Sequence, residues 1–146
     1  MKKIALLMMC VATMAFASCS SLSTAASSNT AASASGASCG KALVALYNSY
    51  KTTGKLDLTN GNNLANALTI VTAYTQLKEN HDNETYKSAF RSGMITSGKP
   101  YISQSNASNL MSGLLASSGL ANVNASNIAQ KAETVTAIIT LLNAIK

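Results

Sequence analysis

Residues 128–145 read IAQKAETVTAIITLLNAI and carry a sustained apolar pattern. Apolar residues recur there at spacings of three and four, which places them on one face of an α-helix. They are Ile128, Ala132, Val135, Ile138, Ile139, Leu142 and Ile145. The β-branched residues after Val135 would also suit a strand, but the helical spacing holds through the whole stretch. The stretch therefore predicts a helix that continues to the C-terminus.

Four segments upstream show the same helical spacing between residues that start or stop helices. In chain order they run from about Ser38 to Thr53, from about Asn62 to Glu79, from Asn80 or Asp82 to about Thr96, and from the Ser105-Asn106 region to Gly119. The second carries two apolar stripes, which predicts a central position. Short connections favour antiparallel neighbours. We therefore expect an all-α fold, a compact bundle of four or five helices over residues 38–146.

Local signals refine the expected boundaries. The sequence Asn-Ala-Ser-Asn occurs at residues 106–109 and 124–127, and both copies are typical of capped helix starts. With Asn124 as the N-cap, Val123 and Ile128 could form a hydrophobic staple. Pro100 disfavours a helical conformation for Lys99, so the third helix should end there. Residues 101–103 should form a short extended connector.

The first residues of the chain have the features of an export signal. Lys2 and Lys3 precede an apolar run from Ile4 to Phe16, and small residues follow. The run is too short to span a bilayer, which needs about 20 helical residues. Residues 1–18 are therefore predicted to be a signal peptide.

Two processing events fit the end of this signal. Ala15-Phe16-Ala17 is an A-x-A site, and cleavage after Ala17 would release a secreted protein. Phe16-Ala17-Ser18-Cys19 (FASC) resembles the lipobox of bacterial lipoproteins, in which the cysteine becomes the lipidated first residue. Residues 20–37, SSLSTAASSNTAASASGA, contain one large apolar residue, Leu22, and are typical of a flexible tether. Residues 19–37 are thus expected to be a lipidated cysteine and its tether.

The combination of signal, FASC and Ser/Ala-rich tether resembles the small Bacteroidota-type bacterial lipoproteins of unknown function. The resemblance implies acyl chains such as palmitate on Cys19 and attachment to the outer membrane. Surface-exposed members of that group carry acidic residues soon after the cysteine, whereas Ser20 and Ser21 follow it here. The resemblance therefore favours the periplasmic side of the membrane.

The cysteine count depends on which processing occurs. Cys10 leaves with the signal, and lipidation would use Cys19. Cys39 would then stand alone and is expected to act as a small apolar residue of the first helix. After plain secretion, Cys19 and Cys39 could instead form a disulfide.

The charge pattern argues against nucleic-acid binding. The formal net charge is +6, and removal of Lys2 and Lys3 leaves +4, with the basic residues scattered along the chain. Nucleic-acid binding usually requires a dense basic stripe, often with aromatic residues beside it. No nucleic-acid partner is expected.

The residues that could support catalysis are few. His81 is the only histidine, and the carboxylates of Glu79, Asp82 and Glu84 lie near it in sequence. The group could bind a metal or move a proton, but a solvated turn between helices is the simpler interpretation. No G-x-S-x-G or glycine-rich phosphate motif occurs. We therefore expect no catalytic, cofactor-binding or metal-binding residues, and no enzyme.

Two functions remain open from the sequence. The first is a non-catalytic envelope protein that binds a protein neighbour or acts as a scaffold at the membrane. The alternative is a carrier that holds a small apolar or lipid ligand between its helices, in a pocket lined by aromatic side chains. The aromatic candidates are Tyr47, Tyr50, Tyr74, Tyr86, Phe90 and Tyr101, which more often belong to a core.

Overall fold

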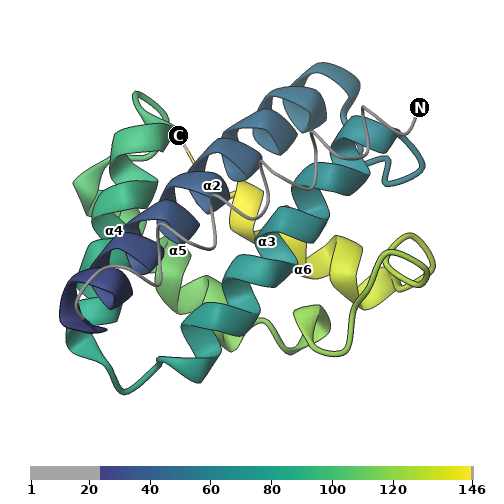
Figure 1. Ribbon diagram of the computed structural model, residues 1–146. Helices are drawn as coiled ribbons and strands as arrows, with labels where there is room; N and C mark the ends of the chain where they lie inside the picture. Colours follow the sequence, from purple (N-terminus) through teal and green to yellow (C-terminus); the bar gives the residue numbers. More distant parts are fainter. Residues whose placement is uncertain (1–23, 146) are drawn as a thin grey trace, which may run out of the picture.

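The computed structural model describes residues 24–145, with side-chain surroundings from residue 30 onward. The described chain is all-helical, which confirms the predicted fold class. Its α-helices are α2 (Thr24–Thr53), α3 (Gly61–Glu79), α4 (Glu84–Gly98), α5 (Gln104–Ala116) and α6 (Ala132–Leu142), and a 3₁₀ turn, η1, covers Ser118–Leu120. Figure 1 shows α2 lying across α3 and α4.

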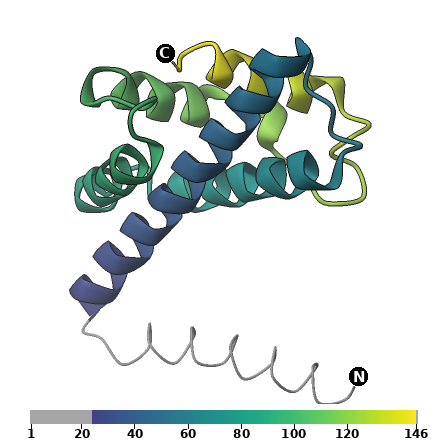
Figure 2. The ribbon, with the colours of Figure 1, turned by 90° about the horizontal axis from the view of Figure 1, so that it is seen from above.

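Helix α2 begins at Thr24 rather than at Ser38. The expectation of a flexible tether is therefore wrong for residues 24–37, which form the first half of this helix. Ala32 has none of its surface exposed, so this half belongs to the folded domain. The alanine-rich composition and the absence of proline suit a helix. Figure 2 shows α2 as one unbroken helix whose amino-terminal end projects beyond the other described helices.

Small residues let α2 and α4 pack backbone to backbone. A Cβ on Gly36 would overlap the carbonyl oxygen of Phe90, and a Cβ on Gly93 would overlap that of Ser33. The Ser97 hydroxyl on α4 donates a hydrogen bond of 2.7 Å to the carbonyl oxygen of Ala37 on α2. Close approach gives many favourable atomic contacts without large side chains. It explains why a segment with so little apolar side-chain area is docked on the bundle.

Helix α3 starts at Gly61, within one residue of the expected position. Asn60 is the N-cap, and its side-chain oxygen accepts hydrogen bonds from the backbone N–H groups of Asn62, at 3.0 Å, and Asn63, at 3.3 Å. Gly54, with a φ of 75°, ends the preceding helix. The Ile70, Tyr74 and Leu77 stripe is fully buried. Leu64 and Leu68 of the second apolar stripe are only half-buried, so α3 is covered mainly on one side, and the expected central position belongs instead to α2, which packs against both α3 and α4.

The starts of α4 and α5 differ slightly from the expected positions. Asn83, rather than Asn80 or Asp82, caps α4 by accepting a bond of 3.0 Å from the N–H of Tyr86. Ser103 caps α5 in a capping box with Asn106. The expected extended connector at residues 101–103 is instead a turn, because the N–H groups of Tyr101 and Ile102 both bond to the carbonyl oxygen of Gly98, at 2.9 Å.

The last helix is shorter than expected, since α6 begins at Ala132. The Asn124 side chain does accept bonds from the N–H groups of Ser126, at 2.9 Å, and Asn127, at 3.2 Å, but it closes a turn rather than starting a helix. Ile128, which belongs to this turn, is completely buried in the core. The Thr134 hydroxyl bonds to the carbonyl oxygen of Gly119 at 2.9 Å and fixes the start of α6 against η1.

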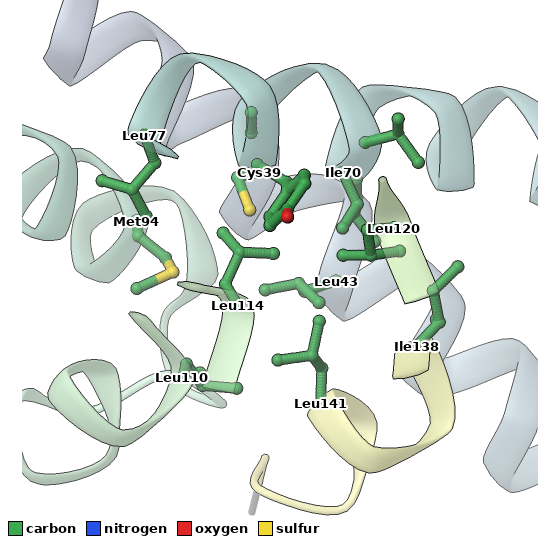
Figure 3. Close-up of a cluster of buried hydrophobic side chains, with 14 of the residues drawn as sticks. Cys39, Leu43, Ile70, Leu77, Met94, Leu110, Leu114, Leu120, Ile138 and Leu141 are labelled. Carbon is green, nitrogen blue, oxygen red and sulfur yellow. The ribbon is translucent and has the colours of Figure 1, made fainter. Parts of the chain in front are cut away.

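The core is built from every helix of the described chain. Figure 3 shows side chains from α2, α3, α4, α5, η1 and α6 pointing toward one another. The largest fully buried side chains of the core are those of Phe90, Leu43, Leu46, Ile70, Leu77, Met94, Ile102, Leu110, Leu114, Leu120, Ile128 and Ile138. Within the described residues, every buried side-chain nitrogen or oxygen has a hydrogen-bond partner. The interior is thus filled mainly by aliphatic side chains.

Candidate functional site

The predicted lipidation site, Cys19, lies outside the described residues, as does the predicted signal peptide of residues 1–18. The described chain starts five positions later, at Thr24, in helix α2. Anchoring at Cys19 would therefore act on the domain through the amino-terminal end of α2.

Cys39 occupies the centre of the core, facing α3 in Figure 3. Its side chain has none of its surface exposed. Removal from water disfavours the thiolate, so burial raises the pKa of the Cys39 thiol to about 12. The structure therefore confirms the predicted role of Cys39 as a small apolar core residue.

His81 lies in the exposed turn between α3 and α4. Its side chain is 61% exposed, with Nε2 3.3 Å from a carboxylate oxygen of Asp82. Nδ1 lies 2.8 Å from the carbonyl oxygen of Lys78. Glu84 pairs instead with Lys87 on α4, at 2.6 Å. The described residues contain no cluster of three or more potential metal ligands. The geometry is that of a solvated turn with local ion pairs.

The aromatic residues divide between the core and its edge. Tyr74, Tyr86 and Phe90 are buried, whereas Tyr47, Tyr50 and Tyr101 are half-buried. Burial raises the pKa of the Tyr86 hydroxyl. Tyr47 and Tyr101 pack together with ring centroids 5.8 Å apart. These rings contact other side chains of the domain, which matches the core role rather than the lining of a shared ligand pocket.

The main hollows beside α2 are open grooves lined by small side chains. Between α2 and α3 lies a groove of about 440 Å³, lined mostly by Ala, Ser and Thr with Leu68 as its largest apolar member. Another groove runs along the surface where α2 meets α4 and is lined entirely by Ala, Ser and Thr. Ala34 borders both grooves. The outward face of α2 is thus a ridge of small residues between two grooves.

A smaller hollow lies between α4 and α5 and carries charge. Lys87, Arg91 and Ser108 line this groove of about 190 Å³. Arg91 donates a hydrogen bond from Nη1 to the Ser108 hydroxyl at 3.4 Å, and Lys87 is paired with Glu84. The two cations therefore have partners within the domain.

Gly36 and Gly40 are the structurally decisive residues that the sequence analysis did not single out. Both lie in the helix interface with α4, where added side chains would meet backbone atoms. Their spacing of four, with Ser33 and Ala37 also small, was a readable signal of close helix packing. Gly93, on α4, is the matching residue across this interface.

Among the helices of the described residues, none combines the length and hydropathy that a membrane-spanning helix requires.

The comparisons with known proteins provide no relative. No protein-family model matches the sequence, and no curated protein and no solved structure matches it.

Proposed function

We propose that this chain is a non-catalytic cell-envelope lipoprotein, anchored to a bacterial membrane by acyl chains on Cys19, whose helical domain binds a protein neighbour or acts as a scaffold. The main support for the proposal is the FASC sequence. It follows an apolar run, and its cysteine lies five positions before the start of helix α2. Two or more acyl chains give stable attachment, whereas a single chain does not. The outer membrane, on its periplasmic side, is the favoured location.

The interior of the domain favours binding at its surface over carriage of a ligand. The large aliphatic and aromatic side chains pack against one another in the core. The grooves beside α2 are open and lined mainly by Ala, Ser and Thr. Pockets for small apolar ligands are usually enclosed and lined by large apolar side chains. A protein surface that fits against α2 suits these grooves better than a lipid does.

Replacement of Cys19 tests the anchor. In cells that make the full chain, the Cys19→Ser variant should leave the membrane fraction and become soluble, because it has no thiol for acylation. Intact-mass measurement of the native protein should show a chain that starts at Cys19 and carries fatty acids. A native chain that starts at Ser18 without fatty acid would refute the proposal and identify a secreted protein.

Crosslinking from the outward face of α2 tests the binding role. A photo-crosslinking residue placed at Ala34, between the two grooves, should capture one discrete protein in intact cells. The matched control is the same residue at Lys55, which is exposed beyond the end of α2. Equal capture from both positions, or capture from neither, would contradict a specific partner at α2.

A further inference from the structure

The segment that joins the anchor to the domain is mostly helix. Helix α2 has 30 residues and begins at Thr24, so its length is about 45 Å. Cys19 precedes Thr24 by five positions, and a fully extended chain of five residues spans at most roughly 17 Å. Little chain is left for a flexible connection between a lipid at Cys19 and the start of α2.

Residues 33–37 of α2 are held against the bundle on two sides. On one side, Gly36 and Gly93 bring its backbone against α4, and Ser97 donates its hydrogen bond to Ala37. On the other side, the Ser35 hydroxyl donates a bond of 2.7 Å to the side-chain oxygen of Gln76 on α3. Because α3 and α4 both hold these residues, α2 is packed as an integral part of the bundle.

The outward face of α2 is unsuited to lying in a bilayer surface. Its exposed positions include Thr30, Ser33, Ser38, Lys41 and Lys51, which are small, polar or charged. Helices that lie within the interface bury large apolar residues such as Leu, Phe or Trp in it. Among residues 30–53 of α2, no exposed position carries such a residue, so attachment at the helix end is favoured over attachment along its side.

We propose that α2 is a rigid stalk that holds the domain upright on the membrane, with its amino-terminal end toward the lipid surface. The loop of residues 54–60, which follows the other end of α2, then points away from the bilayer. This inference rests on the proposed lipid anchor at Cys19. It gives the domain a fixed orientation and presents both α2 grooves at a set height to a neighbouring protein.

Distances from labelled positions to the membrane surface test the stalk. The full lipidated protein is placed in vesicles of phosphatidylethanolamine and phosphatidylglycerol that carry an energy-transfer acceptor on the headgroups. A donor fluorophore is attached to the Thr30→Cys or the Lys51→Cys variant, both at exposed positions. These positions are roughly 30 Å apart along α2, so transfer should be at least about twofold stronger from position 30.

A longer connection provides the matched control. Insertion of about ten Gly and Ser residues before Thr24 creates a flexible tether and should remove most of the difference between the two positions. Equal transfer from both positions in the lipidated protein without the insertion would overturn the stalk and leave the anchor intact. A protein that carries no fatty acid and does not bind the vesicles would overturn the anchor itself.

Discussion

At the scale of single residues, burial decides what a side chain can do. The Cys39 thiol is enclosed by the core, and its pKa is raised to about 12 by that burial. Asp57 lies at the surface, where hydrogen bonds from the Thr59 hydroxyl and N–H lower the pKa of its carboxyl. Asn106 is nearly buried and uses both ends of its amide to join separate segments.

The burial of Cys39 predicts an unreactive thiol. With a pKa of about 12 in place of 9.0, the thiolate fraction at pH 8 is roughly a thousandfold smaller. Labelling of Cys39 with a maleimide at pH 8 should therefore be very slow in the native Cys19→Ser variant and fast in guanidinium chloride. The exposed Lys51→Cys variant serves as a control that labels rapidly in both conditions. Rapid native labelling at Cys39 would contradict its place in the core.

The hydrogen bonds of Asn106 predict that the stability of an Asn106→Asp variant depends on pH. Its side-chain oxygen accepts a bond of 2.7 Å from the N–H of Ser103, and its nitrogen donates to the carbonyl oxygens of Tyr101, at 3.2 Å, and Ala144, at 3.4 Å. Asn106→Asp keeps the acceptor but turns a carboxylate toward two carbonyls. We expect a loss of about 1–3 kcal/mol in the free energy of unfolding at pH 7.

The pH dependence separates this effect from a general loss of packing. Burial and the two carbonyls should raise the pKa of the new carboxyl above its unfolded value. Its protonated form can donate a hydrogen bond, so part of the lost stability should return as the pH falls below that raised pKa. Asn109→Asp, at an exposed position of the same helix, is the matched control and should show neither effect. Chemical unfolding of both variants at pH 7 and pH 5 measures the difference.

At the scale of elements, the close packing of α2 against α4 requires glycines, which have no side chain, at the contact between the two helices. Gly36, Gly40 and Gly93 each face atoms of the opposite helix at distances that leave no room for a Cβ. Glycine in a helix costs roughly 0.5–1 kcal/mol relative to alanine. Contact between the two backbones offsets this cost, and it accounts for glycines that the helical pattern alone leaves unexplained.

Gly93→Ala should therefore destabilise the domain despite the better helix propensity of alanine. Its Cβ would overlap the carbonyl oxygen of Ser33 and would force α2 away from α4. We expect a loss of about 1–3 kcal/mol in the free energy of unfolding, typical of overpacking. Gly61→Ala is the matched control, because nothing lies within 4 Å of a Cβ there. It should be neutral or slightly stabilising in the same denaturant titration, whereas stabilisation by both changes would contradict the close packing.

At the scale of the whole molecule, one core joins all the helices. Helix α6 contributes Thr134, Ile138, Leu141 and Leu142 to it, and Ile145 is buried beyond its end. The Ala144 carbonyl is bonded to Asn106, which ties the C-terminal segment to α5. The segment after α6, up to Ile145, is therefore part of the fold.

Ile138→Asp should abolish cooperative folding. Ile138 has none of its surface exposed, and a buried carboxylate replaces an apolar contribution of about 1.5–3 kcal/mol with a large desolvation cost. Thr136→Asp places the same charge on the exposed side of α6 and should change the melting temperature only slightly. Thermal unfolding followed by circular dichroism measures both. An unchanged midpoint in Ile138→Asp would exclude this face of α6 from the core.

Local patterns were sufficient to predict the helical class, the bounds of α3 and the burial of Ile138 and Leu142 in α6, whereas Ala132, which the same pattern places on the core face, is exposed. Those features depend on residues close in sequence, such as Asn60 with its capped N–H groups and the spaced apolar residues after Ala132. Local signals were weaker for element starts, since Asn124 can cap a turn as well as a helix.

The sequence by itself determined which segments have the apolar periodicity of core helices, together with the export-signal and FASC pattern at the amino terminus. Only the tertiary structure decided that residues 24–37 form the first half of α2. A Ser/Ala-rich segment lacks the large apolar side chains that predict folding from sequence. Its docking depends on the backbone of α4, which lies more than 50 positions away at Phe90 and Gly93 and can be recognised only in space.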